Sequence, residues 1–371
     1  MKIKCTKANL LSALNIVSKA VSTKTTMPIL ECVLIEAYSD SIKLTANDLE
    51  IGIETILEGE VIEMGRIAIE AKRFIDIVRK QSDSDIYIES TPDFNTIIRC
   101  ERFNSSNPSK SGEEFTELPT IEKNKCVTIS QFTLREIIKQ TIFAISDTAS
   151  NKLMTGEYFE ISGGKLKVVA LDGHRISLRN VEVKTDADNI KAVVPGKTLN
   201  DISKIITGGV DDMVNIYFSE RHILFEFDNT VVVSRLIEGD FFNISTMFNV
   251  DTQTKVIANT SEFYNCIDRV SLYIRENEKK PLIIDVKNNM TYLKVPGGQS
   301  GSADEEIEVK KTGNDIIIGF NPKFVMDVLR VIDDEEVEMH MENSKRPLVI
   351  KNETEDYIYV ILPVNINVGA N

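Results

Sequence analysis

The sequence has no long hydrophobic run and little that would support a disulfide framework. No apolar stretch reaches the roughly 18 residues that a membrane-spanning helix needs. The N-terminal residues Met1–Cys5 lead directly into an amphipathic segment and do not resemble a signal peptide. The five cysteines are scattered, without a Cys-x-x-Cys pair. We therefore expect a cytoplasmic protein that does not associate with a membrane and has no disulfides, metal site or cofactor.

Basic residues are scarce relative to acidic ones, and this deficit argues against a nucleic-acid binder. The chain has 43 Lys and Arg residues against 57 Asp and Glu residues, a formal net charge of −14. The charges are unevenly distributed, because the expected amphipathic helices are together mildly basic and the acidic residues concentrate elsewhere. Two interpretations stay open: acidic strands and loops that are simply solvated, or one weakly positive helical surface on a protein with an acidic exterior.

Three copies of one amphipathic helix indicate an internal repeat. In each copy, basic, acidic and basic residues stand at positions i, i+4 and i+7, on one face of a helix, and apolar residues fill the opposite face. Two-residue turn signals repeat in step with the helices, about every 125 residues. The polar triplets are Lys72, Asp76 and Arg79; Lys197, Asp201 and Lys204; and Lys323, Asp327 and Arg330, and the turns are Ser39-Asp40, Gly163-Gly164 and Asn288-Asn289.

These markers predict three copies of one domain, at residues 1–120, 125–247 and 252–371. Each copy is expected to run helix, strands, helix, strands. Antiparallel sheets on one side and helices on the other make an α+β architecture.

Local signals place the ends of some elements. A hydroxyl residue able to cap the first helix of each copy is expected at Thr6, Ser130 and Thr260. The Ser-rich stretch Asn104–Glu114 and the loop at residues 297–304 are expected to be flexible.

Two short motifs suggest an enzyme, but the other residues that each kind of site needs are absent from the sequence. The stretch Pro195–Thr198 resembles the end of a phosphate-binding loop, yet Lys191 stands where that loop needs a second glycine. The stretch Asp172–Arg175 combines an acid, an imidazole and a guanidinium, but neither His222 nor His340 has ligand spacing to it. A turn between two strands explains this second motif better.

Several segments of the sequence are similar to those of a known family. Over its whole length, the chain resembles the bacterial beta sliding clamps, the processivity subunits of DNA polymerase III. The segments that carry the resemblance are Met27–Leu30, Thr45–Glu50, Gly163–Arg175, Ser234–Gly239 and Tyr359–Pro363.

The resemblance implies a non-catalytic DNA clamp. Two chains would form a head-to-tail homodimer, a closed ring of six domains with helices inside and sheets outside, around duplex DNA of any sequence. The implied partners are the polymerase III catalytic subunit, the clamp loader, and other polymerases and repair proteins that carry short linear motifs.

The resemblance also implies three sets of site residues. The DNA-binding set, to which the repeat adds Lys197, is Lys24, Lys72, Arg73, Thr148, Lys152, Leu153 and Lys197. The set for partner peptides is Leu171, Gly173, His174, Arg175, Ile176, Phe242, Met247, Val360, Ile361, Leu362, Pro363 and Val364. The dimer contact would join Arg102 and Phe103 of one chain to Leu272 and Tyr273 of the other.

Two other classes of protein stay possible at this point. A repeat-built scaffold that binds peptides but not DNA would suit the net charge of −14 and the weakly charged helices of the last repeat. A nucleotide-hydrolysing enzyme would need Lys197 at its phosphate site. Retention on circular DNA separates a clamp from a scaffold.

Overall fold

The computed structural model describes residues 1–148, 150–275, 280–298 and 301–366. The chain forms two compact units. The first comprises Met1–Arg135, Lys184–Ala187 and Lys197–Leu236, and the second comprises Glu136–Val183, Asp188–Gly196 and Ile237–Asn371. The middle repeat is divided between the two units, whereas the first and last repeats each lie within one.

The α-helices of the described residues lie where the amphipathic pattern predicts them. They are α1 (Lys7–Val17), α2 (Ala71–Arg79), α3 (Gln131–Thr141), α4 (Gly196–Ile205), α5 (Thr260–Ser271) and α6 (Pro322–Leu329). Short 3-10 helices cover Ser18–Ala20, Pro28–Glu31, Gly112–Glu114, Ile142–Ala144 and Lys152–Thr155. None of the described helices is long and apolar enough to cross a membrane.

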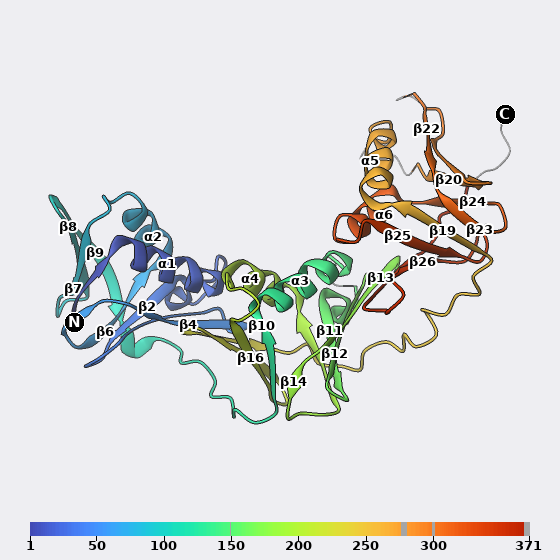
Figure 1. The fold of residues 1–371 in the computed structure, drawn as a ribbon. Coiled ribbons are helices and arrows are strands. Elements are labelled where there is room, and N and C mark those ends of the chain that lie inside the picture. The colour runs from blue at the N-terminus through green and yellow to red at the C-terminus, as the bar shows by residue number, and fades with distance from the viewer. Residues whose placement is uncertain (149, 276–279, 299–300, 367–371) are drawn as a thin grey trace. The chain divides into compact units, whose positions relative to one another are not determined.

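The first unit contains one antiparallel sheet, with α1 and α2 on one of its faces (Figure 1). Its strand order in the described residues is β14-β10-β16-β17-β18-β4-β3-β2-β6-β9-β8-β7-β1-β5. The strands are β1 (Lys2–Thr6), β2 (Cys32–Ala37), β3 (Ile42–Asn47), β4 (Ile51–Leu57), β5 (Glu60–Glu63), β6 (Gly65–Glu70), β7 (Asp85–Ser90), β8 (Asn95–Cys100), β9 (Phe103–Ser111), β10 (Cys126–Ser130), β14 (Lys184–Thr185), β16 (Met213–Phe218), β17 (His222–Phe227) and β18 (Thr230–Arg235).

The second unit contains two antiparallel sheets, ordered β15-β11-β12-β13-β27-β26-β25-β19-β23 and β22-β21-β20-β24. The strands of the larger sheet are β11 (Gly156–Ser162), β12 (Lys165–Leu171), β13 (Arg175–Glu182), β15 (Ile190–Pro195), β19 (Thr254–Asn259), β23 (Lys310–Gly313), β25 (Glu336–Met341), β26 (Leu348–Lys351) and β27 (Tyr357–Ile361). Those of the smaller are β20 (Leu282–Lys287), β21 (Met290–Val295), β22 (Ala303–Glu308) and β24 (Ile316–Phe320). Helices packed against antiparallel sheets confirm the predicted α+β class.

Neighbouring repeats are joined by paired strands. Within the first unit, β4 of the first repeat pairs with β18 of the middle repeat, and the hydroxyl oxygens of Thr55 and Thr230 lie 2.8 Å apart across the ladder. Within the second unit, β13 of the middle repeat pairs with β27 of the last, so that Arg175 lies opposite Ile361. This second pairing brings together segments almost 200 residues apart in the sequence and builds the candidate site.

Each repeat opens with a strand, which the sequence prediction missed. Strands β1, β10 and β19 come directly before α1, α3 and α5. Thr6 and Ser130 cap their helices as predicted, because each side chain accepts a backbone N–H of the first turn. The predicted cap Thr260 is wrong. Asn259 caps α5 by accepting the Glu262 N–H at 2.9 Å, and the Thr260 hydroxyl donates to the Asp334 carbonyl.

The prediction that Asn104–Glu114 is flexible is also wrong. Most of this stretch belongs to β9, which pairs with β8 along its first part and with β6 along its last. Asn107 is buried there, and its side-chain amide donates to the Thr96 carbonyl. Backbone pairing and such polar contacts hold the strand without the apolar alternation that would reveal it. In the loop at residues 297–304, β22 already begins at Ala303, and residues 299–300 lie outside the described part.

Candidate functional site

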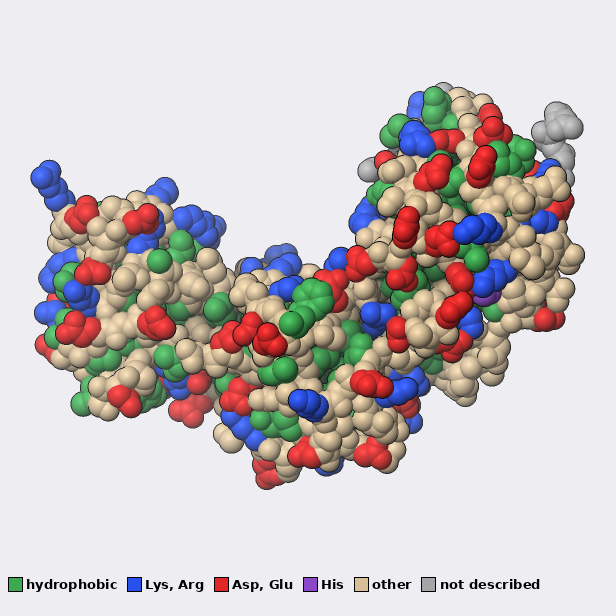
Figure 2. Space-filling model, viewed as in Figure 1, with side chains coloured by type: hydrophobic (Ala, Val, Ile, Leu, Met, Phe, Trp, Pro, Cys, Tyr) green, Lys and Arg blue, Asp and Glu red, His purple; other side chains and the backbone are tan. Residues whose placement is uncertain are grey.

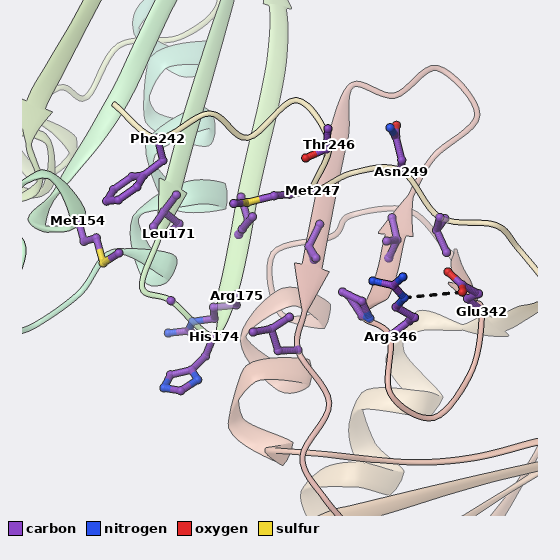
Figure 3. Close-up of a pocket in the computed structure, with 17 residues that line it drawn as sticks. Met154, Leu171, His174, Arg175, Phe242, Thr246, Met247, Asn249, Glu342 and Arg346 are labelled. Atoms are coloured by element: carbon purple, nitrogen blue, oxygen red, sulfur yellow. Dashed lines mark ion pairs between the residues drawn. The ribbon is translucent and has the colours of Figure 1, made fainter. Parts of the chain in front are cut away.

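A cavity of about 580 Å³ lies in the second unit, where β13 and β27 run side by side (Figure 3). Its floor is apolar, formed by buried side chains of both strands and of β26, including Val349 and Val360. The segment after β18 packs on the same face of the sheet, where Phe241 stacks on Tyr158 with ring centroids 4.6 Å apart. The lining residues are Met154, Leu171, Gly173, His174, Arg175, Ile176, Phe242, Thr246, Met247, Asn249, Val250, Glu342, Arg346, Pro347, Val349, Val360 and Leu362.

Most of the residues predicted to bind partner peptides line this cavity. They come from the turn before β13, from the segment after β18 and from the end of β27. Three predicted residues do not line it. Ile361 is fully buried in the core on the other face of β27. Pro363 and Val364 follow β27, and the Val364 N–H donates to the Gly319 carbonyl at 2.8 Å. Residues 367–371 of the C-terminal tail lie outside the described residues.

The remaining lining residues were not predicted. Thr246, Asn249 and Val250 belong to the irregular segment between β18 and β19, and Glu342 and Arg346 belong to the turn between β25 and β26. Neither segment has a hydrophobic period that could indicate a site. Arg346 and Glu342 form a surface ion pair at 3.7 Å at the far end of the cavity (Figure 3).

The Asp172–Arg175 stretch is a tight turn, as the simpler interpretation predicted. The Asp172 carboxylate accepts the backbone N–H groups of His174 and Arg175, at 2.9 and 3.1 Å. Gly173 has a φ of 89°, a region that residues with a side chain rarely adopt. Among the described residues, no group of His, Cys, Asp and Glu is arranged to hold a metal ion.

Arg175 is held within the protein although it was predicted to bind peptide. Its side chain is 8% exposed. Its Nε donates to Asp172 Oδ2 at 3.0 Å, its Nη1 donates to Asp327 Oδ2 at 2.6 Å, and its Nη2 donates to the carbonyl of Phe143. It therefore contributes to the wall of the cavity, while its guanidinium nitrogens are bonded to other parts of the chain.

The predicted DNA-binding residues are distributed over both units. In the first unit Lys24, Lys72 and Arg73 are exposed. Lys72 and Arg73 open α2, where the Glu70 carboxylate accepts both of their backbone N–H groups. Figure 2 shows Lys and Arg side chains gathered over α2 and α4. These helices provide cations that a phosphate backbone can approach.

Lys197, also in the first unit, is exposed but already paired. Its Nζ donates to Asp48 Oδ2 at 2.7 Å, which ties α4 to the loop before β4. Nearby, burial raises the pKa of Asp201, while the charges of Lys197 and Lys204 act in the opposite direction. Lys197 thus serves the junction of two repeats in addition to any contact with DNA.

The predicted loop residues lie in the second unit. Thr148 and Lys152 are exposed, and Leu153 is partly buried against Gly239. The Leu153 N–H donates to the side chain of Asn151, which starts the short 3-10 helix. Of these three residues, Lys152 alone supplies a charge for a phosphate contact.

The four predicted dimer residues carry exposed side chains. Phe103 and Tyr273 are 39% and 40% exposed, and Leu272 is 81% exposed. Arg102 is exposed beside Phe103. A cavity of about 340 Å³ lies between α2 and Phe103, with Ile77 in its lining. Leu272 and Tyr273 are adjacent in the sequence and both exposed, and a contiguous exposed apolar patch often marks a contact with another protein.

The chain matches family models of known proteins along nearly its whole length. Models of the N-terminal, central and C-terminal domains of the DNA polymerase III beta subunit match residues 1–121, 128–243 and 246–365. The three predicted repeats thus correspond to three domains of one family.

Curated relatives and solved structures agree with these matches. The beta sliding clamp of Staphylococcus epidermidis is 29% identical over 364 residues, which cover 95% of this chain and 96% of that protein. The crystal structure of a putative DNA polymerase III beta subunit from Eubacterium rectale is 53% identical with a TM-score of 0.95, covering 99% of this chain and 100% of that one. The DNA polymerase sliding clamp of Bacillus subtilis is 29% identical with a TM-score of 0.94, at the same coverage.

Proposed function

We propose that this chain, which belongs to the DNA polymerase III beta subunit family, closes around duplex DNA as a head-to-tail homodimer. It is a DNA sliding clamp, a non-catalytic subunit that confers processivity on the polymerase. Two chains of three domains each would make a ring of six domains, with the helices facing the DNA and the sheets outside. Domain boundaries at residues 1–120, 125–247 and 252–371 remain part of this proposal.

The charges on the helices suit a contact that slides. Lys24, Lys72 and Arg73 are exposed, and the net charge of the chain is −14. Contacts from Lys and Arg to phosphate carry no sequence information, and counterions replace them at similar cost along the duplex. A weakly basic lining in an otherwise acidic protein would therefore hold DNA loosely, and closure of the ring would prevent its escape.

The exposed residues at the edge of the first repeat and near the start of the last repeat suggest how two copies meet. Leu272 of one copy would enter the cavity beside Phe103 and Ile77 of the other. The first part of β9 pairs with β8 on one side and has no described strand on the other, and β22 is the edge of its sheet. Edges of this kind pair readily with a strand of another chain. The acidic strand β22 and the basic start of α2 would add opposite charges to the seam.

The cavity at β13 and β27 is proposed to receive short peptides from the replicative polymerase, the clamp loader and repair proteins. Residues far apart in the sequence line this one cavity, including Leu171, Met247 and Leu362, and this observation supports the proposal most directly. Met247 and Leu362 are 44% and 42% exposed, so an apolar anchor such as Leu or Phe would cover side chains that now face water.

Retention on circular DNA tests the clamp. The protein would be loaded onto nicked circular duplex by its clamp loader and separated from free protein by gel filtration. We expect it to elute with the circle and to be released when a restriction enzyme linearises the DNA. A scaffold that binds peptides alone, which the net charge of −14 would suit, would not co-elute with either form. Equal retention on circular and linear DNA would contradict a topological link.

The place of the protein in the cell follows from this role. A clamp that works on the chromosome together with the replicative polymerase belongs in the bacterial cytoplasm.

A further inference from the structure

Helix α6 supports the peptide cavity from behind through two side chains one turn apart. Phe324 stacks on the ring of His174, with centroids 6.0 Å apart and an angle of 20° between the planes. The guanidinium carbon of Arg175 lies 4.6 Å from the centroid of the same Phe324 ring. Asp327 accepts a hydrogen bond from Arg175 at 2.6 Å. His174 and Arg175 both line the cavity, whereas Phe324 and Asp327 do not.

The guanidinium of Arg175 is shielded from water, so these partners fix its position. The ring of Phe143 lies 5.2 Å from the guanidinium carbon, in addition to Phe324. The exposed fractions of the Arg175 and Asp327 side chains are 8% and 12%. A pair so shielded from water is costly to break, because the remaining charge stays buried without its partner.

The repeat shows that this pairing is not needed to form the helix. Asp76 occupies the same position in α2 as Asp327 does in α6. Its side chain is 55% exposed, and its ion pair is with Arg79 of its own helix, at 3.5 Å. In the last copy, Asp327 keeps the matching pair with Arg330 of its own helix, at 3.6 Å, and adds a shielded link to Arg175 of another repeat.

We propose that Phe324 and Asp327 are positioning residues for the peptide cavity: they set where His174 and the 172–175 turn stand, and so control peptide affinity without touching the peptide. This inference rests on the proposed binding of partner peptides. Asp327 acts through Arg175, and Phe324 acts through both Arg175 and His174. The affinity of the cavity thus depends on a helix that does not line it.

The test measures the affinity of a fluorescein-labelled peptide with a Leu-Phe pair by fluorescence anisotropy, with the full-length protein. Asp327→Asn keeps the size of the side chain and removes its charge, and we expect about tenfold weaker binding, as is typical when coupled neighbours are perturbed. Phe324→Leu, which removes the stacking, should also weaken binding. Asp76→Asn, the same substitution in the first copy of the helix, should bind like the wild type.

Two further variants distinguish positioning from a general loss of stability. Asp327→Glu keeps the carboxylate and should bind the peptide more tightly than Asp327→Asn does. If Asp327 acts through Arg175, Arg175→Lys combined with Asp327→Asn should lose no more affinity than the more damaging single substitution. Thermal unfolding of each variant is recorded alongside, because a purely structural role would lower the midpoint and leave peptide affinity unchanged.

The outcomes are separable. Wild-type affinity in Asp327→Asn and Phe324→Leu overturns the positioning role while the peptide site stands. If the losses of peptide affinity in Arg175→Lys and Asp327→Asn add up in the double variant, the proposed link between the two residues is overturned. If the wild-type protein does not distinguish the peptide from one with both anchors replaced by Ala, the proposed peptide site itself fails, and the positioning role fails with it.

Discussion

At the scale of single residues, the carboxyl group of Glu157 in β11 titrates far from its usual range. The side chain is fully buried, and Oε1 accepts a hydrogen bond from the Thr141 hydroxyl at 2.9 Å. Oε2 has no partner among the described residues. Burial raises the pKa of Glu157 to about 8, so the folded protein keeps a proton that the unfolded chain, with a pKa near 4.5, releases.

Stability should therefore fall as pH rises through this range. The contribution of Glu157 to the free energy of unfolding is fully present below about pH 4.5 and is lost as the pH rises toward 8. The loss amounts to at most about 1.4 kcal/mol per pH unit. Glu157→Gln does not titrate, and we expect its free energy of unfolding to increase relative to the wild type between pH 5 and pH 8. Urea unfolding at several pH values measures this difference.

The neighbouring carboxylate provides the control for Glu157. A hydrogen bond from Lys167 lowers the pKa of Glu160, so its contribution is present above the unfolded pKa and is lost only in acid. The difference in free energy of unfolding between Glu160→Gln and the wild type should accordingly stay constant from pH 5 to pH 8. A flat difference for Glu157→Gln as well would mean that Glu157 is ionised in the folded protein at neutral pH.

Leu362 gives a second prediction at this scale. It lines the cavity and is 42% exposed, whereas Val364, with 38% exposure, does not line it. Leu362→Asp should weaken peptide binding about thirtyfold, the equivalent of losing about 2 kcal/mol of apolar contact. Val364→Asp should bind like the wild type in the same anisotropy assay. Equal losses for the two variants would place the bound peptide beyond the cavity described above.

At the scale of elements, helix α2 carries the clearest prediction about DNA. Reversing charge at Lys24, Lys72 and Arg73 together should shorten retention on circular DNA at low salt, because phosphate contacts are lost. The difference from the wild type should shrink as salt is raised, and peptide affinity should not change. Retention is measured as the half-life of the complex on nicked circles. Lys72 and Arg73 also line the cavity proposed to receive Leu272, so the mass of this variant in solution is measured alongside to separate loss of DNA contacts from loss of the dimer.

A matched triple variant guards against an effect of net charge alone. Lys125, Lys165 and Lys184 are exposed and lie outside the helices. Their replacement by Glu changes the net charge by the same amount. It should leave retention near the wild-type value if DNA contacts the helices. Equal losses in both triple variants would instead indicate long-range repulsion between the protein and DNA.

Helices and hairpins could be predicted from this sequence because their signals are local. A 3.6-residue period marks α2, α4 and α6, and two-residue turns mark the hairpins. Strands β1 and β10 have only five residues each and run directly into helices, so no separate pattern shows them. Strand β9 was missed because it is rich in Ser and Asn and is held by backbone pairing.

The candidate site was predictable only in part. The 172–175 turn and the end of β27 have distinctive sequences, and these were assigned through the resemblance to a family. Thr246 and Arg346 stand in irregular segments, and their place beside the cavity depends on the pairing of β13 with β27. The role of Asp327 could not be read from the repeat, because the repeat suggests the same environment for all three copies of that residue.

At the scale of the whole molecule, the state of association decides whether a ring exists. Leu272 is 81% exposed, and a carboxylate placed there would have to be desolvated in an apolar seam. Leu272→Asp should raise the dissociation constant of the dimer about thirtyfold, the equivalent of about 2 kcal/mol for a central contact. The mass in solution across a dilution series measures this change.

Val210 offers a matched control, because it is 61% exposed and lies outside the proposed seam. In the same dilution series, Val210→Asp should show the dimer dissociation constant of the wild type. A wild-type protein that stays a single chain at every concentration would leave half a ring, and would contradict the homodimer.

The ladders that join successive repeats bear on where the proposed ring would open. Five residue pairs connect β18 to β4, and five connect β13 to β27. Main-chain bonds of this kind resist being pulled apart together, because all of them share the load. If two chains form the proposed ring, these ladders would resist opening within each unit, and a loader that admits DNA would separate the two chains from each other instead.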